Sequence, residues 1–193
     1  MSGQKAVTPT AEGLAASVRA TKGRGLPPVH LWNPPFCGDL DIRIARDGTW
    51  FYLGTPIGRP ELVKLFSSIL KIEDGKYFLV TPVEKVGIKV DDAPFVAVDF
   101  EVSGEKDAQS LTFHTHVGDE AVAGSDHPLR VVRDASTGEP SPYVMIRAGL
   151  EALIDRKSFY RLVELGVHQD GWFGVWSAGQ FFPIIPSKEL EEA

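Results

Sequence analysis

Two histidines, His114 and His116, are the first side chains in this sequence whose spacing suggests chemistry. In a strand, residues two apart share a face, so both imidazoles would point the same way. Glu120, Asp126 and His127 follow, and histidines with a nearby carboxylate form a metal-ligand pattern. The flanking glycines and the later histidine that usually accompany such a pair are missing. We therefore expect no metal and interpret the pair as solvent-facing histidines on an edge strand; the alternative is a metal-dependent enzyme that uses His114, His116 and His127.

A polar segment between two apolar runs offers a second group of candidates, Thr81, Glu84 and Lys85. Thr81 and Lys85 would contact a phosphate or a sugar, and the Glu84 carboxylate would accept from an amine or a ribose hydroxyl. The alternative is a β-turn with a Glu–Lys pair on the surface.

Two arginines, Arg59 and Arg156, each stand just ahead of a predicted helix. Backbone N–H groups at a helix N-terminus favour anions, so the two arginines together would clamp a phosphorylated ligand. The alternative is that each arginine forms a salt bridge that holds the two halves of the chain in register.

The second half of the chain contributes Tyr143, Arg147, Trp176 and Ser177. Arg147 would bind an anion and Trp176 would stack on a base. Packing within strands and core is the alternative for all four. No residue is assigned a catalytic role and no cofactor is expected, so the pattern leans away from an enzyme.

Composition narrows the class of protein. The chain has 193 residues, 43% of them hydrophobic, and a formal net charge of -6. An acidic chain repels a phosphate backbone, which argues against a nucleic-acid polymer as partner. The single cysteine, Cys37, allows no intrachain disulfide and indicates a reducing compartment. The first twenty residues lack the apolar run of a signal peptide, and no stretch is long and apolar enough to span a membrane, so we expect a cytoplasmic protein.

Hydrophobic periodicity predicts an α+β fold that is mostly antiparallel sheet. Alternation predicts strands such as 40–45, 77–80, 86–90, 95–102 and 110–117. The apolar stripe of Leu62, Leu65, Phe66, Ile69 and Leu70 predicts a helix that begins at Pro60. A second helix region is expected to open at Leu150 and to restart at Phe159.

The chain also repeats itself. An Ile-x-Arg entry, a helix, an Asp-Gly turn and an aromatic strand occur in 57–80 and again in 154–175. This predicts that Leu62 corresponds to Phe159, Leu65 to Leu162 and Phe66 to Val163, all of them buried, with a ligand crevice between the copies. We therefore expect a partly disordered tail at 1–30, a first repeat domain at 31–91 and a second repeat domain at 92–193.

Several longer strings carry a family resemblance. The chain resembles a bacterial family known as domain of unknown function 1285. In the first half the resemblance lies in Trp32-Asn33-Pro34, Gly38-Asp39-Leu40-Asp41-Ile42, Asp47-Gly48-Thr49-Trp50 and Leu79-Val80-Thr81-Pro82-Val83-Glu84-Lys85. In the second half it lies in His127-Pro128-Leu129-Arg130, Pro142-Tyr143-Val144, Arg147-Ala148-Gly149-Leu150-Glu151-Ala152-Leu153-Ile154 and Gly174-Val175-Trp176-Ser177-Ala178-Gly179. The family motif tends to have Asn where this chain has His116.

The resemblance implies a duplicated α+β fold whose second half is superficially like a pleckstrin-homology domain. It also implies a nucleotide-type ligand at the interface between the halves and a role in signal transduction with a protein partner. Together with the residues above, it favours a non-catalytic module that senses or binds a small molecule. A protein-interaction adaptor is a further alternative.

Overall fold

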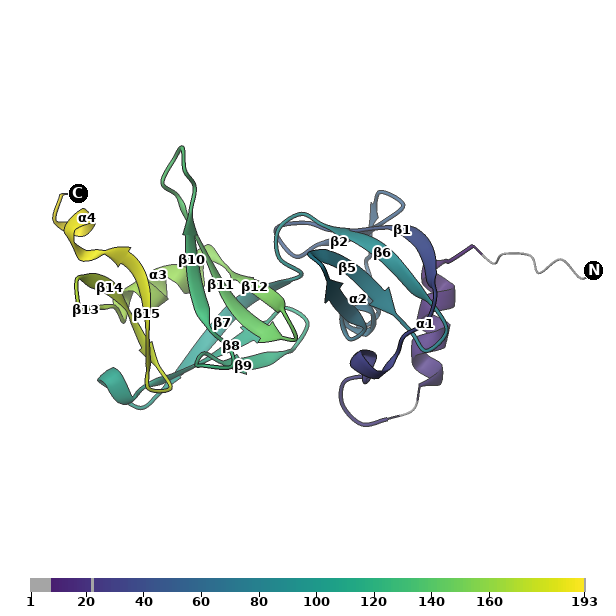
Figure 1. Cartoon of the computed structure of the whole chain (residues 1–193), viewed down its shortest axis with the longest axis horizontal. Coiled ribbons are helices and arrows are strands. Elements are labelled where there is room, and N and C mark those ends of the chain that lie inside the picture. The colour runs from purple at the N-terminus through teal and green to yellow at the C-terminus, as the bar shows by residue number, and fades with distance from the viewer. Residues whose placement is uncertain (1–7, 22, 193) are drawn as a thin grey trace, which may run out of the picture. The chain divides into compact units, whose positions relative to one another are not determined.

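The computed structural model describes residues 8–21 and 23–192, and the chain divides into two compact units that meet in the sequence at Asp91 and Asp92 (Figure 1). Each unit is described by itself. None of the helices in the described part of the chain is long and apolar enough to cross a membrane.

In its described residues, the N-terminal unit has one six-stranded sheet, two α-helices and one short 3-10 helix. Its elements are α1 (Ala11–Ala20), η1 (Val29–Leu31), β1 (Phe36–Ile44), β2 (Trp50–Tyr52), β3 (Thr55–Pro56), α2 (Pro60–Ser67), β4 (Leu70–Glu73), β5 (Lys76–Val80) and β6 (Lys85–Val90). The strands lie in the order β3-β2-β1-β6-β5-β4. Neighbours are antiparallel except β1 and β6, which run parallel.

Alternation along β1 separates the two faces of this sheet. Leu40 and Ile42 are buried, whereas Asp41 between them is exposed. On the buried side, Phe66 of α2 stacks on Trp50, with ring centroids 6.3 Å apart. The face that carries Asp41 is therefore open to solvent.

Among its described residues, the segment 1–30 contains α1, which buries Leu14 and Val18 as part of the unit. One expectation for this unit is corrected. The helix that begins at Pro60 ends at Ser67, and Leu70 opens β4 instead of continuing the helix. Leu70 fits the helical spacing of the apolar residues before it and is also the first buried residue of the next strand, so the periodicity alone placed it in the helix.

The C-terminal unit has a second six-stranded sheet and a separate three-stranded sheet. Its elements are β7 (Phe95–Ser103), η2 (Lys106–Ala108), β8 (Ser110–Thr115), β9 (Glu120–Val122), β10 (Leu129–Arg133), β11 (Pro140–Arg147), β12 (Leu150–Ile154), α3 (Arg156–Glu164), β13 (Val167–Gln169), β14 (Trp172–Ser177), β15 (Gln180–Pro186) and α4 (Ser187–Glu191). The sheets have the orders β10-β11-β12-β7-β8-β9 and β13-β14-β15.

The two six-stranded sheets have the same topology. In each, two antiparallel meanders of three strands are joined by parallel pairing of the first strand with the sixth, β1 with β6 and β7 with β12. The protein is therefore an α+β fold built from duplicated units.

The helices do not follow this duplication as predicted. α2 lies between the third and fourth strands of its sheet, whereas α3 comes after the sixth strand of its sheet and leads into β13. Both helices are followed by a strand and an Asp-Gly turn, which explains the repeat in the sequence, but those strands belong to sheets of different kinds. Of the six side chains expected to be buried, Leu62, Leu65 and Val163 are only half-buried.

The second helix also begins later than expected. Residues Leu150–Ile154 form β12, with Leu150, Ala152 and Ile154 buried at every second position. Asp155 is the N-cap of α3, and its Oδ1 accepts a hydrogen bond from Ser158 N at 2.8 Å.

Candidate functional site

The seam between β1 and β6 is the least regular part of the N-terminal sheet. Asp39 pairs with Gly87, and the next paired residues are Arg43 and Lys89. Four steps along β1 therefore face two steps along β6. A bulge of this kind disrupts the ladder locally and leaves backbone groups without their regular partners.

A hollow of about 550 Å³ opens at this bulge. Its lining is Asp39, Leu40, Asp41, Ile42, Gly87, Ile88 and Lys89. A second hollow of about 400 Å³ shares Asp39 and residues 87–89 and extends to residues 75–78 of β5 and its turn. Both lie within the N-terminal unit, and we call them together the seam hollow.

Gly87 shapes the floor of the seam hollow. A Cβ placed on Gly87 would lie 2.2 Å from Asp39 Oδ1, closer than real Cβ contacts, and 3.3 Å from its Cγ. The absence of a side chain lets the Asp39 carboxylate lie across the strand. Glycine inside a strand often marks such a close approach.

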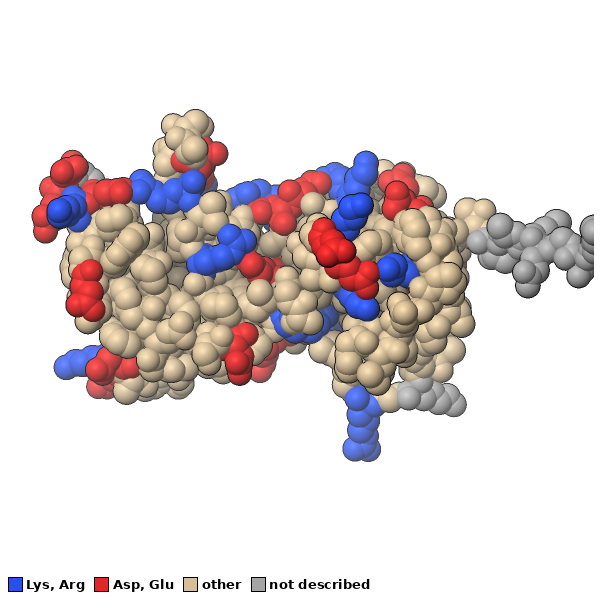
Figure 2. All heavy atoms as spheres, in the orientation of Figure 1, with Lys and Arg blue, Asp and Glu red and all other residues tan. Residues whose placement is uncertain are grey.

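Four charged side chains line the seam hollow without being used elsewhere. Within the described part of the chain, the side chains of Asp39, Asp41, Lys76 and Lys89 make no hydrogen bond or ion pair, and all four residues are exposed. On the face shown in Figure 2, basic and acidic side chains are interspersed over each unit. The hollow therefore offers two acceptor carboxylates, Asp39 and Asp41, and two donor ammonium groups, Lys76 and Lys89.

Lys85, a predicted ligand residue, lies on the same strand as Gly87 but has partners of its own. Its Nζ is 2.8 Å from Glu73 Oε2 and 4.6 Å from the centre of the Phe78 ring. Phe36 meets Phe78 edge-on, with centroids 6.0 Å apart. Hydrogen bonds from Lys85, and secondarily from Lys71, hold the pKa of Glu73 below its ordinary value.

Thr81 and Glu84 belong to one tight turn. The Thr81 side chain is buried, and its Oγ1 accepts from Glu84 N at 3.1 Å and from Val83 N at 3.3 Å. Glu84 is half-buried, and this burial raises the pKa of its carboxyl. The Thr81 hydroxyl is therefore engaged in the turn itself.

The two candidate arginines have different surroundings. Arg59 is the N-cap residue of α2 and lines a small pocket of about 120 Å³ together with Arg19 and Tyr52. Arg156 is the first residue of α3, and its Nη2 is 3.0 Å from Glu139 Oε1 in an exposed pair. They do not occupy equivalent places in the duplicated sheets.

Tyr143 and Arg147 lie on β11 and contact acidic residues of their own unit. The Tyr143 hydroxyl donates to Asp92 Oδ1 at 2.6 Å. Arg147 Nη1 is 2.8 Å from Asp119 Oδ2, and its guanidinium lies 4.9 Å from the centre of the Phe95 ring. Any anion that bound Arg147 would compete with Asp119.

Trp176 and Ser177 lie on β14, where they join the three-stranded sheet to the six-stranded one. The buried Ser177 hydroxyl donates to Ala123 O at 2.7 Å and accepts from Leu111 N at 2.9 Å. Gln109 Nε2 donates to Trp176 O at 3.0 Å. These bonds give Ser177 a role in the fold.

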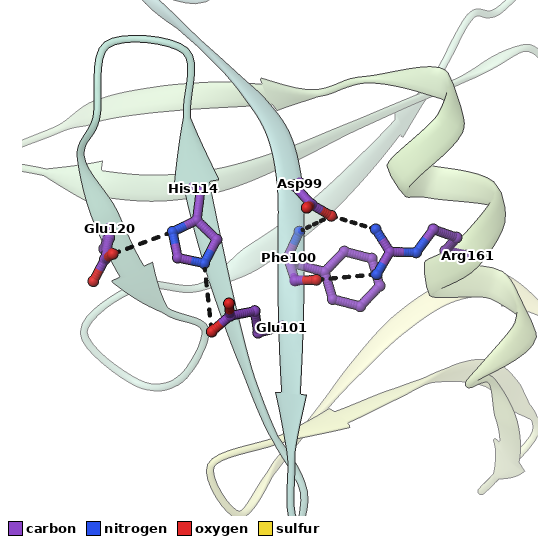
Figure 3. A network of polar contacts seen from close by, with 6 residues as sticks. All are labelled: Asp99, Phe100, Glu101, His114, Glu120 and Arg161. Atoms are coloured by element: carbon purple, nitrogen blue, oxygen red, sulfur yellow. Dashed lines mark hydrogen bonds and ion pairs between the residues drawn. The ribbon is translucent and has the colours of Figure 1, made fainter.

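The histidines of the metal alternative have separate partners. His114 lies between two carboxylates, with Nδ1 3.3 Å from Glu120 and Nε2 3.8 Å from Glu101 (Figure 3). His116 Nδ1 accepts from Val96 N at 3.3 Å, and His127 Nδ1 is 3.0 Å from Met145 O. Within residues 8–21 and 23–192, no group of three or more His, Cys, Asp or Glu side chains is arranged to hold a metal ion.

Beside His114, an arginine fastens α3 to the sheet. Arg161 forms an ion pair with Asp99, donates to Phe100 O at 3.1 Å and lies over the Phe100 ring (Figure 3). The hydrogen bond from Arg161 lowers the pKa of Asp99. This network serves packing, because it holds α3 on β7.

Asp39, Asp41, Gly87 and Lys89 are not among the ligand residues predicted from the sequence. Two signals were present, since Asp39 and Asp41 stand in the family string Gly38-Asp39-Leu40-Asp41-Ile42 and Gly87 interrupts an apolar strand between Val86 and Ile88. The bulge that opens the seam hollow gives no sequence signal, because it depends on pairing between strands far apart in the chain.

Two family models match consecutive parts of the chain, from residue 27 to residue 184. The model described as "Domain of unknown function (DUF1285), N-terminal domain" matches residues 27–93, and that described as "Protein of unknown function (DUF1285), C-terminal domain" matches residues 94–184. No curated protein matches the chain.

Two solved structures are similar. A DUF1285 family protein from Silicibacter pomeroyi DSS-3 is 69% identical, with a TM-score of 0.87, over 93% of this chain and 98% of that one. A DUF1285 family protein from Shewanella baltica OS155 is 33% identical, with a TM-score of 0.50, over 64% of this chain and 90% of that one.

Proposed function

The chain belongs to the DUF1285 family, whose function its description leaves open, and from its own geometry we propose that it is a non-catalytic module that binds a small polar molecule. The observation that carries the proposal is the seam hollow, a polar space of about 550 Å³ at a break in the β1–β6 ladder. Ligand sites are concave and have a few convergent polar groups.

The lining favours a ligand with both hydroxyl or amino donors and an anionic group. Asp39 and Asp41 accept hydrogen bonds, and Lys89 offers an ammonium for an anion. A nucleotide has this combination, since its ribose hydroxyls suit carboxylates and its phosphate suits a lysine. We include in the proposal a sensing role in which a protein partner responds to the bound ligand. The sequence-based location of the ligand between the halves stays a prediction.

The contacts of the lining side chains also indicate which of them a ligand can bind at the lowest free-energy cost. Asp39, Asp41 and Lys89 are exposed and have no side-chain partner among residues 8–21 and 23–192, so a ligand would contact them at little cost. Lys85 would first have to leave Glu73. We therefore assign Lys85 a secondary role, as a neighbour of the site on the Phe78 side.

Native mass spectrometry of freshly purified protein, followed by calorimetry with nucleotides, sugars and amino acids, tests this proposal. Asp39→Asn and Lys89→Ala should each weaken a ligand found this way by about tenfold or more, because a charge-assisted contact contributes roughly 1.5–3 kcal/mol. Glu61→Gln and Lys64→Ala, exposed positions on α2, are the matched controls. Tight binding untouched by both site variants would exclude the seam hollow, and an absence of binding across the panel would refute the proposed function.

A further inference from the structure

An apolar groove lies in the C-terminal unit, on elements that the seam hollow does not involve. It has a volume of about 180 Å³ and runs between α3, β14 and β15, with α4 beside it. The side chains that form it include Phe159, Val163, Phe173, Ile184 and Leu190. We call it the α3–β15 groove.

One charged side chain, Arg133 of β10, stands among these apolar walls. It forms an ion pair with Glu189 of α4, and its Nε donates to Gly138 O at 3.4 Å. Both members of the ion pair are more than a third exposed, so the pair is solvent-screened and weak. The Glu189 carboxylate is therefore replaceable.

The chain itself indicates the chemistry that suits this place. Glu189 puts a carboxylate on Arg133, and the next residue, Leu190, puts an apolar side chain on the groove. Leu190 nevertheless stays 42% exposed and leaves the groove open. The carboxylate of Glu189 and the apolar side chain of Leu190 therefore already lie side by side at the edge of the groove, and Leu190 does not fill it.

We propose that the α3–β15 groove binds a medium-chain carboxylate, with the alkyl chain along Val163, Phe173 and Ile184 and the carboxylate on Arg133 in place of Glu189. The size of the groove sets the chain length. A cavity of about 150 Å³ holds one benzene ring, so 180 Å³ accommodates roughly six to eight carbon atoms. This site is independent of the seam hollow and of its ligand.

Octanoate, below its micelle concentration, is the probe, with butanoate, octylamine and octan-1-ol for comparison. In a titration of the full chain followed by amide NMR, octanoate should shift the signals of residues around Val163, Ile184 and Leu190. Affinity should rise about threefold to fourfold for each methylene from butanoate to octanoate, as expected for burial of CH₂ groups. Among the three eight-carbon probes, octylamine should bind worst, because its charge opposes Arg133.

Substitutions test the contact of the carboxylate and the packing of the alkyl chain separately. Arg133→Ala should weaken octanoate about threefold to tenfold, whereas Arg156→Ala, an exposed arginine of the same unit, should not. Glu189→Gln should tighten binding about twofold to fivefold, because it removes the competing carboxylate. Val163→Trp should abolish binding by filling the groove, and Val167→Trp on the exposed part of β13 should leave it unchanged.

The gain expected from Glu189→Gln keeps the test decisive even if a core variant fails to fold. Absence of octanoate binding to both the native chain and Glu189→Gln would overturn the proposal. Equal binding of octanoate, octan-1-ol and octylamine, unaffected by Arg133→Ala, would overturn it as well, since the carboxylate would then play no part.

Discussion

Replacing Ser177 by alanine tests how far the stability of the C-terminal unit depends on the hydroxyl group of this one side chain. Ser177 is fully buried, and its Oγ bridges Leu111 N and Ala123 O at 2.9 and 2.7 Å. Leu111 O already accepts from Ala123 N, so the serine completes the end of the β8–β9 ladder. Alanine would leave one donor and one acceptor buried without partners. At roughly 1–3 kcal/mol for each group, the expected loss is about 2–6 kcal/mol of unfolding free energy.

Urea unfolding measures the loss, and hydrogen exchange locates it. The Leu111 amide should exchange faster in Ser177→Ala, whereas the amide of Phe113 should change only with global stability. Ser125→Ala, an exposed serine, is the control. A change below about 0.5 kcal/mol with undiminished protection of Leu111 would show that water or a neighbour replaces the hydroxyl. The structural role argued for Ser177 would then be wrong.

Three further predictions concern the N-terminal unit. Phe66→Ala should cost about 3–5 kcal/mol in urea unfolding, because the ring is fully buried against Trp50; a cost below about 1 kcal/mol would contradict that packing. Hydrogen bonding to Lys85 depresses the folded-state pKa of Glu73, so the ion pair stabilises the fold above the ordinary glutamate pKa of about 4.3, and this stabilisation is lost as pH falls through the folded-state pKa. Glu73→Gln should therefore be less stable than the native chain at pH 7 and similar to it near pH 3. Burial raises the pKa of Glu84, so its ionisation lowers the stability of the fold as pH rises past about 4.3. Glu84→Gln should be more stable than the native chain at pH 7 and equally stable near pH 3. A less stable Glu84→Gln at pH 7 would show that Glu84 has a stabilising partner.

Local patterns in the sequence identified most strands correctly. Alternation in 40–44 and 110–115 is the pattern of a half-buried strand, and both segments form strands whose apolar side chains are buried. Where two patterns overlap, the local signal failed. Leu70 fits the helical stripe and opens β4, and residues 150–154 fit either period and form β12.

The sequence also indicated a duplication, but it located the repeat in two segments of helix and Asp-Gly turn. The units that are duplicated in the structure are the six-stranded sheets, and the helices occupy different positions in them. Helix-and-turn motifs are short and recur readily. The shared strand order depends on pairing between distant segments, which no local comparison detects.

The amino-acid sequence by itself determined the fold class, the family and the buried face of most strands, because each depends on residue types that are close in the chain. Only the tertiary structure decided that β1 pairs with β6, that their ladder breaks between Asp39 and Arg43, and that Gly87 leaves room there for a carboxylate. It also decided that Lys85 meets Glu73 and that Ser177 meets Leu111. The physical reason is that backbone pairing and ion pairing across a sheet depend on register, and register is set by the packing of the whole unit.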